Sequence, residues 1–500
     1  MKMRHASCPA WPCGLALAGA LSAVPAAAID ESSGRWAAVD RYAAAEMKAA
    51  HLPGAALAVV EAGRIVYAKG YGVADPGGRP VTPETPFVLG SLSKSFTAVA
   101  VMQLVESHTV ELDAPVQRYL PWFAVADRDA SRRITIRQLL QQTSGLPERA
   151  GLAGLADGDE SEGALERRVR ELASEPLTRP VGSAFQYCNG NYDTLGLVVQ
   201  AVSGSSYEQY LESHVFHPLE MAHSFTSRAS AREHGLATGY RLWFGVPIAA
   251  PSLPYVRGTL PSGYLISSAE DVGHYLMAHL DDGRYRDRVL LSPAGIAQLH
   301  RPSPFATGFR DTKTYAGYAM GWFTGERAGV ATLHHGGSTP GYTTEMAILP
   351  ERRLGLVVLT NAFAEHHLCE GVLALLLGRE PPPTAARKAL GVEWLWLALL
   401  QLVFLAVSAA LLRRWASSPR KRPAPVRGRW WRLAALLLPN VAVLLLVARE
   451  LAGRDLPLRV SLLFFPALTW LPLACAAFAA AWGVSCTLWA SRVLAIRQER

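Results

Sequence analysis

The stretch Gly90-Ser91-Leu92-Ser93-Lys94-Ser95-Phe96 lies between a strand-like segment, residues 86–89, and an apolar helical run, residues 97–105. A serine in the first turn of such a helix has its hydroxyl near the positive end of the helix dipole. Lys94 follows three residues after Ser91, so both side chains share one helix face and can meet. A serine nucleophile needs this arrangement if a lysine is to accept its proton. The alternative is an ordinary helix with a solvated lysine, because Ser-x-x-Lys also occurs by chance.

Length and charge limit the classes of protein that fit. The chain has 500 residues, which is too long for a single core, so we expect at least two structural units. The formal net charge is +8, but a dense basic group within residues 413–432 lies between two apolar runs. That is where membrane proteins place cytoplasmic charge. With no nucleic-acid motif in the chain, we expect a membrane and no nucleic acid as a partner.

The N-terminus has the features of a secretory signal peptide, residues 1–28. Lys2 and Arg4 precede an apolar run at residues 15–24, and alanines at 26–28 offer a cleavage site. The alternative is an N-terminal membrane anchor, which the short apolar run disfavours. Cysteines and histidines lack the spacing of a disulfide framework or a metal site, so we expect no metal and no cofactor.

Strand-like segments occur early and late in the region before residue 380. They are residues 54–60, 64–68, 330–335, 342–349 and 354–359. A helix is expected at residues 36–49, and helices and loops fill the middle of the region. This order predicts one α+β domain, residues 29–380, with one antiparallel sheet built from both ends and a helical second lobe.

A proline-rich linker, residues 381–392, precedes an apolar membrane region, residues 393–500. Three transmembrane helices are predicted at about 394–412, 431–449 and 460–490. The third contains Pro466 and Pro472, which favours one kinked or tilted span. With the basic loop inside, we expect a multi-pass protein of the cytoplasmic (inner) membrane whose large domain is extracytoplasmic.

Two further segments complete a set with Ser91-x-x-Lys94. Tyr187-x-Asn189 stands at the head of a predicted helix, and His335-Gly336-Gly337-Ser338 ends a predicted strand. In this order the three segments resemble the active-site motifs of the penicillin-recognising serine hydrolases, closest to the branch of class C β-lactamases, D-alanyl-D-alanine carboxypeptidases and esterases. The resemblance covers residues 36–375. It implies a β-lactamase/DD-peptidase-like fold, with helices flanking the sheet.

The resemblance also implies roles for the first two motifs. Ser91 would be the acylated nucleophile, and Lys94 would orient or deprotonate it. Tyr187 would be the companion acid/base that returns the proton to the leaving group, and Asn189 would hold the substrate amide and Lys94. The alternatives are a core aromatic for Tyr187 and a helix N-cap for Asn189.

The third motif would complete an oxyanion hole and a substrate-binding edge. The backbone N–H groups of Ser91 and Ser338 would bind the oxyanion, with Gly337 and His335 in the same segment. His335 stands where β-lactamases carry lysine, and a histidine supplies that charge only when protonated. This lowers the expectation of efficient β-lactam hydrolysis. By strand alternation, the neighbouring His334 is expected to face solvent.

Two other positions depart from the family pattern. Gln142 replaces a histidine that many relatives have before Thr-Ser-Gly-Leu, and we expect this position to be structural. Cys188 replaces the usual serine of the second motif, where a thiol could pack without taking part in chemistry.

The sequence therefore predicts a membrane-anchored serine hydrolase that cleaves an amide or ester through an acyl-serine. D-amino-acid peptides of the cell-wall kind or small esters are the expected small-molecule or peptide substrates. One alternative is a β-lactamase. An alternative of another class is a non-catalytic, ligand-sensing ectodomain, which could dispense with Ser91, Lys94 or Tyr187.

Overall fold

The computed structural model describes residues 31–152, 155–156, 158–306, 313–384, 396, 398–404, 406–407, 410, 438, 441–449 and 457–495. The predicted signal peptide, the basic loop and nearly half of each of the first two predicted spans lie outside the described residues. The signal peptide and the loop remain predictions.

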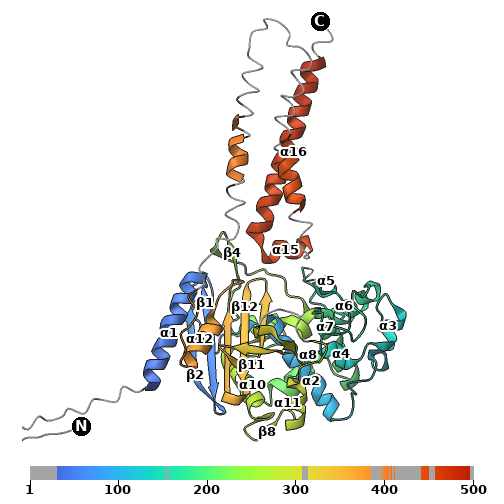
Figure 1. Cartoon of the computed structure of the whole chain (residues 1–500), viewed down its shortest axis with the longest axis vertical. Helices are drawn as coiled ribbons and strands as arrows, with labels where there is room; N and C mark the ends of the chain where they lie inside the picture. The colour runs from blue at the N-terminus through green and yellow to red at the C-terminus, as the bar shows by residue number, and fades with distance from the viewer. Residues whose placement is uncertain are drawn as a thin grey trace, which may run out of the picture.

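A seven-stranded antiparallel sheet with the strand order β2-β1-β13-β12-β11-β10-β9 forms the centre of the domain (Figure 1). The strands are β1 (Gly54–Glu61), β2 (Arg64–Gly72), β9 (Gly317–Tyr318), β10 (Phe323–Arg327), β11 (Val330–Thr339), β12 (Tyr342–Leu349) and β13 (Leu354–Thr360). β1 pairs with β13 from Ala55↔Thr360 to Glu61↔Leu354. The prediction of one sheet built from both ends of the domain is confirmed.

Helices cover both faces of the sheet. α1 (Glu31–Ala50) and α12 (Leu368–Leu376) pack together on one face, and α10 (Ala269–Leu280) packs on β1 and β13 from the other. Strand alternation explains this, since Leu57 and Val59 join the core beneath α1 and α12 while Ala56, Ala58 and Val60 join the opposite core. β1 and β13 are therefore buried on both faces along almost their whole length.

A helical lobe beside the sheet contains the middle of the chain, as expected. Its helices are α2 (Ser93–Glu106), α3 (Arg128–Arg133), α4 (Ile136–Leu140), α5 (Glu148–Leu152), α6 (Ala164–Glu171), α7 (Asn189–Ser203), α8 (Tyr207–Leu211), α9 (Arg228–Glu233) and α11 (Pro293–His300). Three short strand pairs complete the domain: β3 (Phe87–Val88) with β6 (Ile266–Ser267), β4 (Tyr240–Trp243) with β5 (Val246–Ala249), and β7 (Arg284–Tyr285) with β8 (Arg288–Val289). α2 and α7 pack against each other and position the first two motifs.

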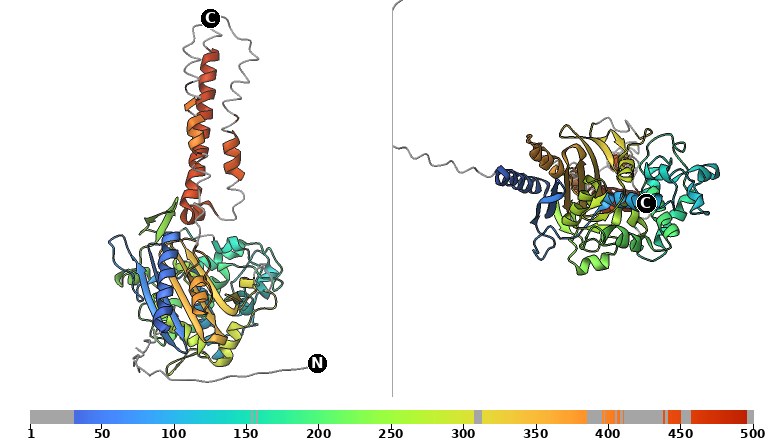
Figure 2. Two further views of the ribbon diagram at one scale, coloured as in Figure 1. Left: turned by 60° about the vertical axis from the view of Figure 1, so that its left-hand side comes forward. Right: turned by 90° about the horizontal axis from the view of Figure 1, so that it is seen from below.

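The C-terminal region stands on one end of the domain (Figures 1 and 2). It includes α15 (Leu458–Phe464) and α16 (Pro466–Ala495), so the predicted third span is divided at Phe465 and α16 continues through Pro472. In the described part of the chain, one helical segment, Pro466–Ser485, is long and apolar enough to cross a membrane. The described residues of the other two predicted spans are helical.

Candidate active site

Ser91 lies in a tight turn that connects β3 to α2. The turn is a 3₁₀ segment, Gly90–Leu92, and Gly90 has φ = 57°, a conformation that glycine adopts without strain. α2 is almost entirely buried after this turn, including Phe96 at 0% exposure. Because α2 is buried in the core, it holds the Ser91 turn in a fixed position.

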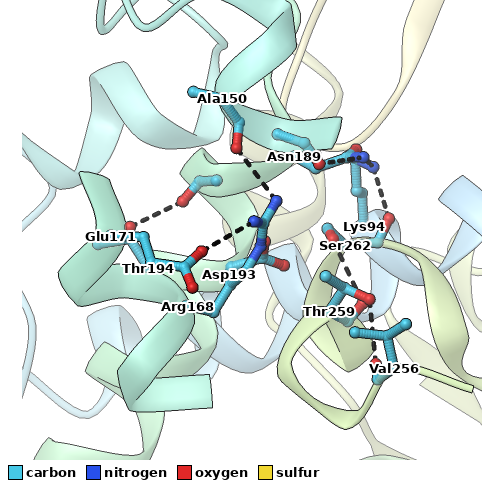
Figure 3. A network of polar contacts seen from close by, with 12 residues as sticks. Lys94, Ala150, Arg168, Glu171, Asn189, Asp193, Thr194, Val256, Thr259 and Ser262 are labelled. Carbon is cyan, nitrogen blue, oxygen red and sulfur yellow. Dashed lines mark hydrogen bonds and ion pairs between the residues drawn. The ribbon is translucent and has the colours of Figure 1, made fainter. Parts of the chain in front are cut away.

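Lys94 is fully buried and is held by three oxygen atoms. Its Nζ lies 3.0 Å from Ser91 Oγ. It also lies 2.8 Å from Asn189 Oδ1 and 2.5 Å from the carbonyl oxygen of Ser262 (Figure 3). Burial lowers the pKa of Lys94 to about 7, an effect that Asp193 partly opposes. The alternative of a solvated lysine on an ordinary helix is therefore wrong.

The second motif brings its tyrosine and its asparagine to the same point. The Tyr187 side chain lies next to Ser91, and burial raises the pKa of its phenol well above the ordinary value, so the phenol is protonated at neutral pH. Asn189 is the first residue of α7, and its amide Nδ2 donates to the carbonyl of Gly151 at 3.3 Å. The N-cap of α7 is Cys188, so the N-cap alternative for Asn189 is wrong.

The third motif lies along the end of β11. The pairing of β10 with β11 extends only as far as Phe323, opposite His334, and within the described chain the Ser91 turn packs beside the following residues of β11. A Cβ on Gly337 would lie 2.1 Å from the Leu89 carbonyl oxygen, and one on Gly90 would lie 2.5 Å from the backbone nitrogen of Ser338. These two glycines therefore allow the nucleophile turn and β11 to approach closely.

A small pocket opens over the nucleophile. Its lining residues include Ser91, Asn189, Ser338, Thr339 and Phe464. Its free volume is about 30 Å³, which is room for about two water molecules. Ser338 is exposed here and Gly337 is buried behind it.

His335 lies behind this pocket. It is 1% exposed, its ring centroid is 6.2 Å from that of Tyr187, and its Nδ1 donates to the carbonyl of Gly336 at 2.7 Å. Burial, together with the nearby charge of Lys94, lowers the pKa of His335 to about 3. The imidazole is therefore neutral at physiological pH and does not supply the positive charge of the family's lysine. Its predicted contact with substrate stays a prediction.

The prediction that His334 faces solvent is wrong. Its side chain is 0% exposed, and its Nε2 lies 2.7 Å from the carbonyl oxygen of Thr314. The rings of Tyr315 and Phe323 pack against it. Strand alternation correctly places His334 on the face opposite His335, but the segment before β9 covers that face as well.

Gln142 links two parts of the site, consistent with the structural role expected of it. Its Oε1 accepts hydrogen bonds from the backbone N–H of Cys188 at 3.0 Å and from Asn191 Nδ2 at 2.5 Å. Cys188 itself is fully buried, and burial raises the pKa of its thiol to about 12. The thiol therefore stays protonated inside the second motif.

A buried ion pair behind Lys94 was not predicted from the sequence. Asp193, at 0% exposure, lies 3.6 Å from Arg168 Nε and close to Ser262, whose carbonyl contacts Lys94 (Figure 3). Burial raises the pKa of Asp193 to about 6. A signal was present, because Asp193 is the only charged residue in the apolar run 192–202 and follows Asn189 by one helical turn. Arg168 could not be singled out from the sequence, because it lies on a separate helix, α6, that carries several other charged residues.

Replacing Gly90 by alanine tests the close approach of the turn to β11. The new Cβ would meet the backbone nitrogen of Ser338 and force β11 away. Loss of one oxyanion donor should lower the acylation rate of Ser91 by about 10²–10³-fold. The measurement is the second-order rate constant of labelling by an acylating probe.

Gly78→Ala is the matched control for this substitution. Gly78 also has a positive φ of 84°, but a Cβ there would meet nothing within 4 Å. Gly78→Ala imposes a similar backbone strain without a clash against Ser338. Equal labelling rates of Ser91 in the two variants would therefore contradict the assignment of Ser338 to the oxyanion hole.

Comparison with known proteins agrees with this geometry. The Beta-lactamase family model matches residues 39–376. The chain is 28% identical over 330 residues to Protein flp of Staphylococcus aureus, covering 66% of this chain and 63% of that protein. It is 33% identical over 323 residues to Penicillin-binding protein 4 of Amycolatopsis lactamdurans, covering 62% and 81%. The chain thus spans less than two thirds of the length of the flp relatives.

Two solved structures share the fold. The octameric penicillin-binding protein homologue from Pyrococcus abyssi has a TM-score of 0.60 at 27% identity, covering 70% of this chain and 79% of that chain. FmtA from Staphylococcus aureus has a TM-score of 0.56 at 21% identity, covering 70% and 89%, and supports the fold alone. From the family match and from the arrangement of Ser91, Lys94 and Tyr187, the chain belongs to the β-lactamase family, whose members are serine hydrolases.

Proposed function

We propose that the chain is a membrane-anchored serine hydrolase that cleaves an amide or ester through an acyl-Ser91 intermediate. The observation that carries this proposal is the contact of Lys94 Nζ with Ser91 Oγ at 3.0 Å, in a site where burial lowers the lysine pKa to about 7. A substantial fraction of the amine is then neutral at physiological pH and can accept the serine proton.

Acylation follows from these positions. Ser91 Oγ attacks the substrate carbonyl carbon as its proton passes to neutral Lys94, and the backbone N–H groups of Ser91 and Ser338 stabilise the oxyanion. When the intermediate collapses, the leaving nitrogen or oxygen takes a proton from the Tyr187 phenol. The Lys94 ammonium then reprotonates Tyr187, so the serine proton is transferred overall to the leaving group.

Deacylation reverses the roles with water as the nucleophile. Lys94, neutral again, accepts a proton from water as its oxygen attacks the acyl carbon. That proton returns to Ser91 Oγ as the ester bond breaks, and the acid product leaves.

The proposed substrates are D-amino-acid peptides of the cell-wall kind or small esters. The similarity to proteins named penicillin-binding proteins supports peptides of this kind. A neutral, buried His335 disfavours the β-lactamase alternative, because the charge of the family's lysine is missing. The contacts among Ser91, Lys94 and Tyr187 disfavour the ligand-sensing alternative, since a sensor does not need them.

The membrane part of the proposal has separate support. Pro466–Ser485 is long and apolar enough to cross a bilayer. The basic residues at 413–432 and the signal-like N-terminus favour an extracytoplasmic domain on the cytoplasmic membrane.

Intact-protein mass spectrometry with benzylpenicillin tests the proposal on the full chain in detergent. We expect a covalent adduct that peptide mapping places on Ser91 and that Ser91→Ala eliminates. An adduct that persists in Ser91→Ala would contradict the nucleophile. Rapid conversion of penicillin to penicilloic acid would favour the β-lactamase alternative, and intact penicillin without an adduct would favour an esterase pocket or the sensor.

A further inference from the structure

The C-terminal segment forms part of the active-site wall. Phe464, the last residue of α15, lines the pocket together with Ser91, Asn189 and Ser338. α15 is packed into the domain, because Val460 is 2% exposed within the main core and the Arg241 guanidinium donates to the Leu462 carbonyl at 3.5 Å. This contact joins the pocket to the apolar C-terminal region.

The apolar helix begins next to the pocket. α16 starts at Pro466, two residues after Phe464, and two residues of chain span at most about 7 Å. Phe464 and Phe465 both pack on Phe363, with ring centroids 5.1 and 5.4 Å apart. If α16 crosses the bilayer, these aromatic rings and the pocket mouth lie at the level of the lipid headgroups.

The β4–β5 hairpin exposes apolar side chains at the same end of the domain. Phe244, Val246 and Ile248 are 36%, 57% and 48% exposed, and Leu458 at the start of α15 is 47% exposed. The hairpin stands beside the base of α16, which contacts β4 (Figures 1 and 2). Large exposed apolar residues next to a candidate membrane span are suited to insertion into the membrane interface.

We propose that the active site opens at the membrane surface and acts on an amphiphile. This substrate is held in the bilayer by its apolar part and presents its amide or ester at headgroup level. The inference rests on the proposed function, since it concerns the substrate of the same Ser91. The chain connectivity agrees with it, because Phe464 lines the pocket and Phe465 alone separates it from the first residue of α16, the candidate membrane span.

Two fluorophosphonate probes with the same reactive group test this proposal. Ser91 Oγ displaces fluoride from phosphorus in both, and the serine proton leaves with it. One probe carries a hydrophilic tail and stays in solution; the other carries a dialkylglycerol tail without a spacer, so its phosphorus stays at headgroup level. The full chain is reconstituted in phosphatidylcholine–phosphatidylglycerol vesicles, and both labelling rates are measured.

We expect the anchored probe to label Ser91 faster than the soluble probe. Val246→Asp should lose this preference, because a carboxylate near the hairpin tip resists insertion into the membrane interface. The anchored probe should then label Ser91 more slowly, while the rate for the soluble probe stays unchanged. Val289→Asp is the matched control: Val289 is 58% exposed on β8, at the opposite end of the domain (Figure 1), and this variant should keep the preference.

The outcomes separate this inference from the proposed function. Labelling by the soluble probe alone, or equal effects of Val246→Asp and Val289→Asp, would overturn the inference and leave the hydrolase intact. Failure of both probes to label Ser91 would overturn the proposed function and this inference with it.

Discussion

Replacing Lys94 by methionine is expected to slow the acylation of Ser91 by about 10²–10⁴-fold, the usual contribution of a positioned general base. Methionine has a similar length and suits a buried site, but it cannot accept the proton of Ser91 Oγ, now 3.0 Å from Nζ. Asn189 Oδ1 and the Ser262 carbonyl would also lose their donor. The measurement is the second-order rate constant for benzylpenicillin adduct formation.

The pH dependence of this rate identifies the base. Only the neutral amine accepts a proton, and burial lowers the pKa of Lys94 to about 7. Acylation of the wild-type protein should therefore rise with pH, with a midpoint near that value, and level off above it. Lys94→Met should show no such rise. Thermal unfolding of both proteins shows whether the variant is folded, and an unchanged pH profile in folded Lys94→Met would contradict Lys94 as the base.

The parts of the fold that were predictable depend on local patterns. β1 and β11–β13 are continuous or alternating apolar segments with turns between them, so their positions followed from the sequence. Likewise, the three-residue spacing of Ser91 and Lys94 predicted that both side chains share one helix face. The resemblance of the three motifs to those of the penicillin-recognising serine hydrolases then implied that Tyr187 and Asn189 lie beside Ser91 and Lys94.

The parts that were missed depend on contacts between distant segments. His334 is buried because a segment before β9 covers a face that alternation alone leaves open. Phe464 lines the same pocket as Ser338, although more than one hundred residues separate them in the chain. The spacing of apolar residues within a segment does not indicate such a distant contact. Arg168 pairs with Asp193 only because α6 packs on α7.

The second large effect is expected from Asp193→Asn, which should destabilise the folded protein by about 3–5 kcal/mol. Asp193 and Arg168 are 0% and 6% exposed, so the substitution would leave the guanidinium buried without its buried counter-charge. Glu171 lies 3.3 Å from Arg168 Nη1, but its carboxylate is largely exposed, so solvent screens its charge and it compensates little for the loss of Asp193. Chemical denaturation, or the shift of the thermal midpoint in detergent, measures this loss.

The matched control removes both charges. Because apolar replacement of a buried ion pair is often neutral in stability, the double variant Asp193→Leu with Arg168→Met should recover most of the loss. The negative charge of Asp193 also raises the pKa of Lys94. Its removal in Asp193→Asn should therefore move the acylation profile towards lower pH. If the single variant were as stable as the wild type and kept the same pH profile, Asp193 would neither balance the charge of Arg168 nor raise the pKa of Lys94.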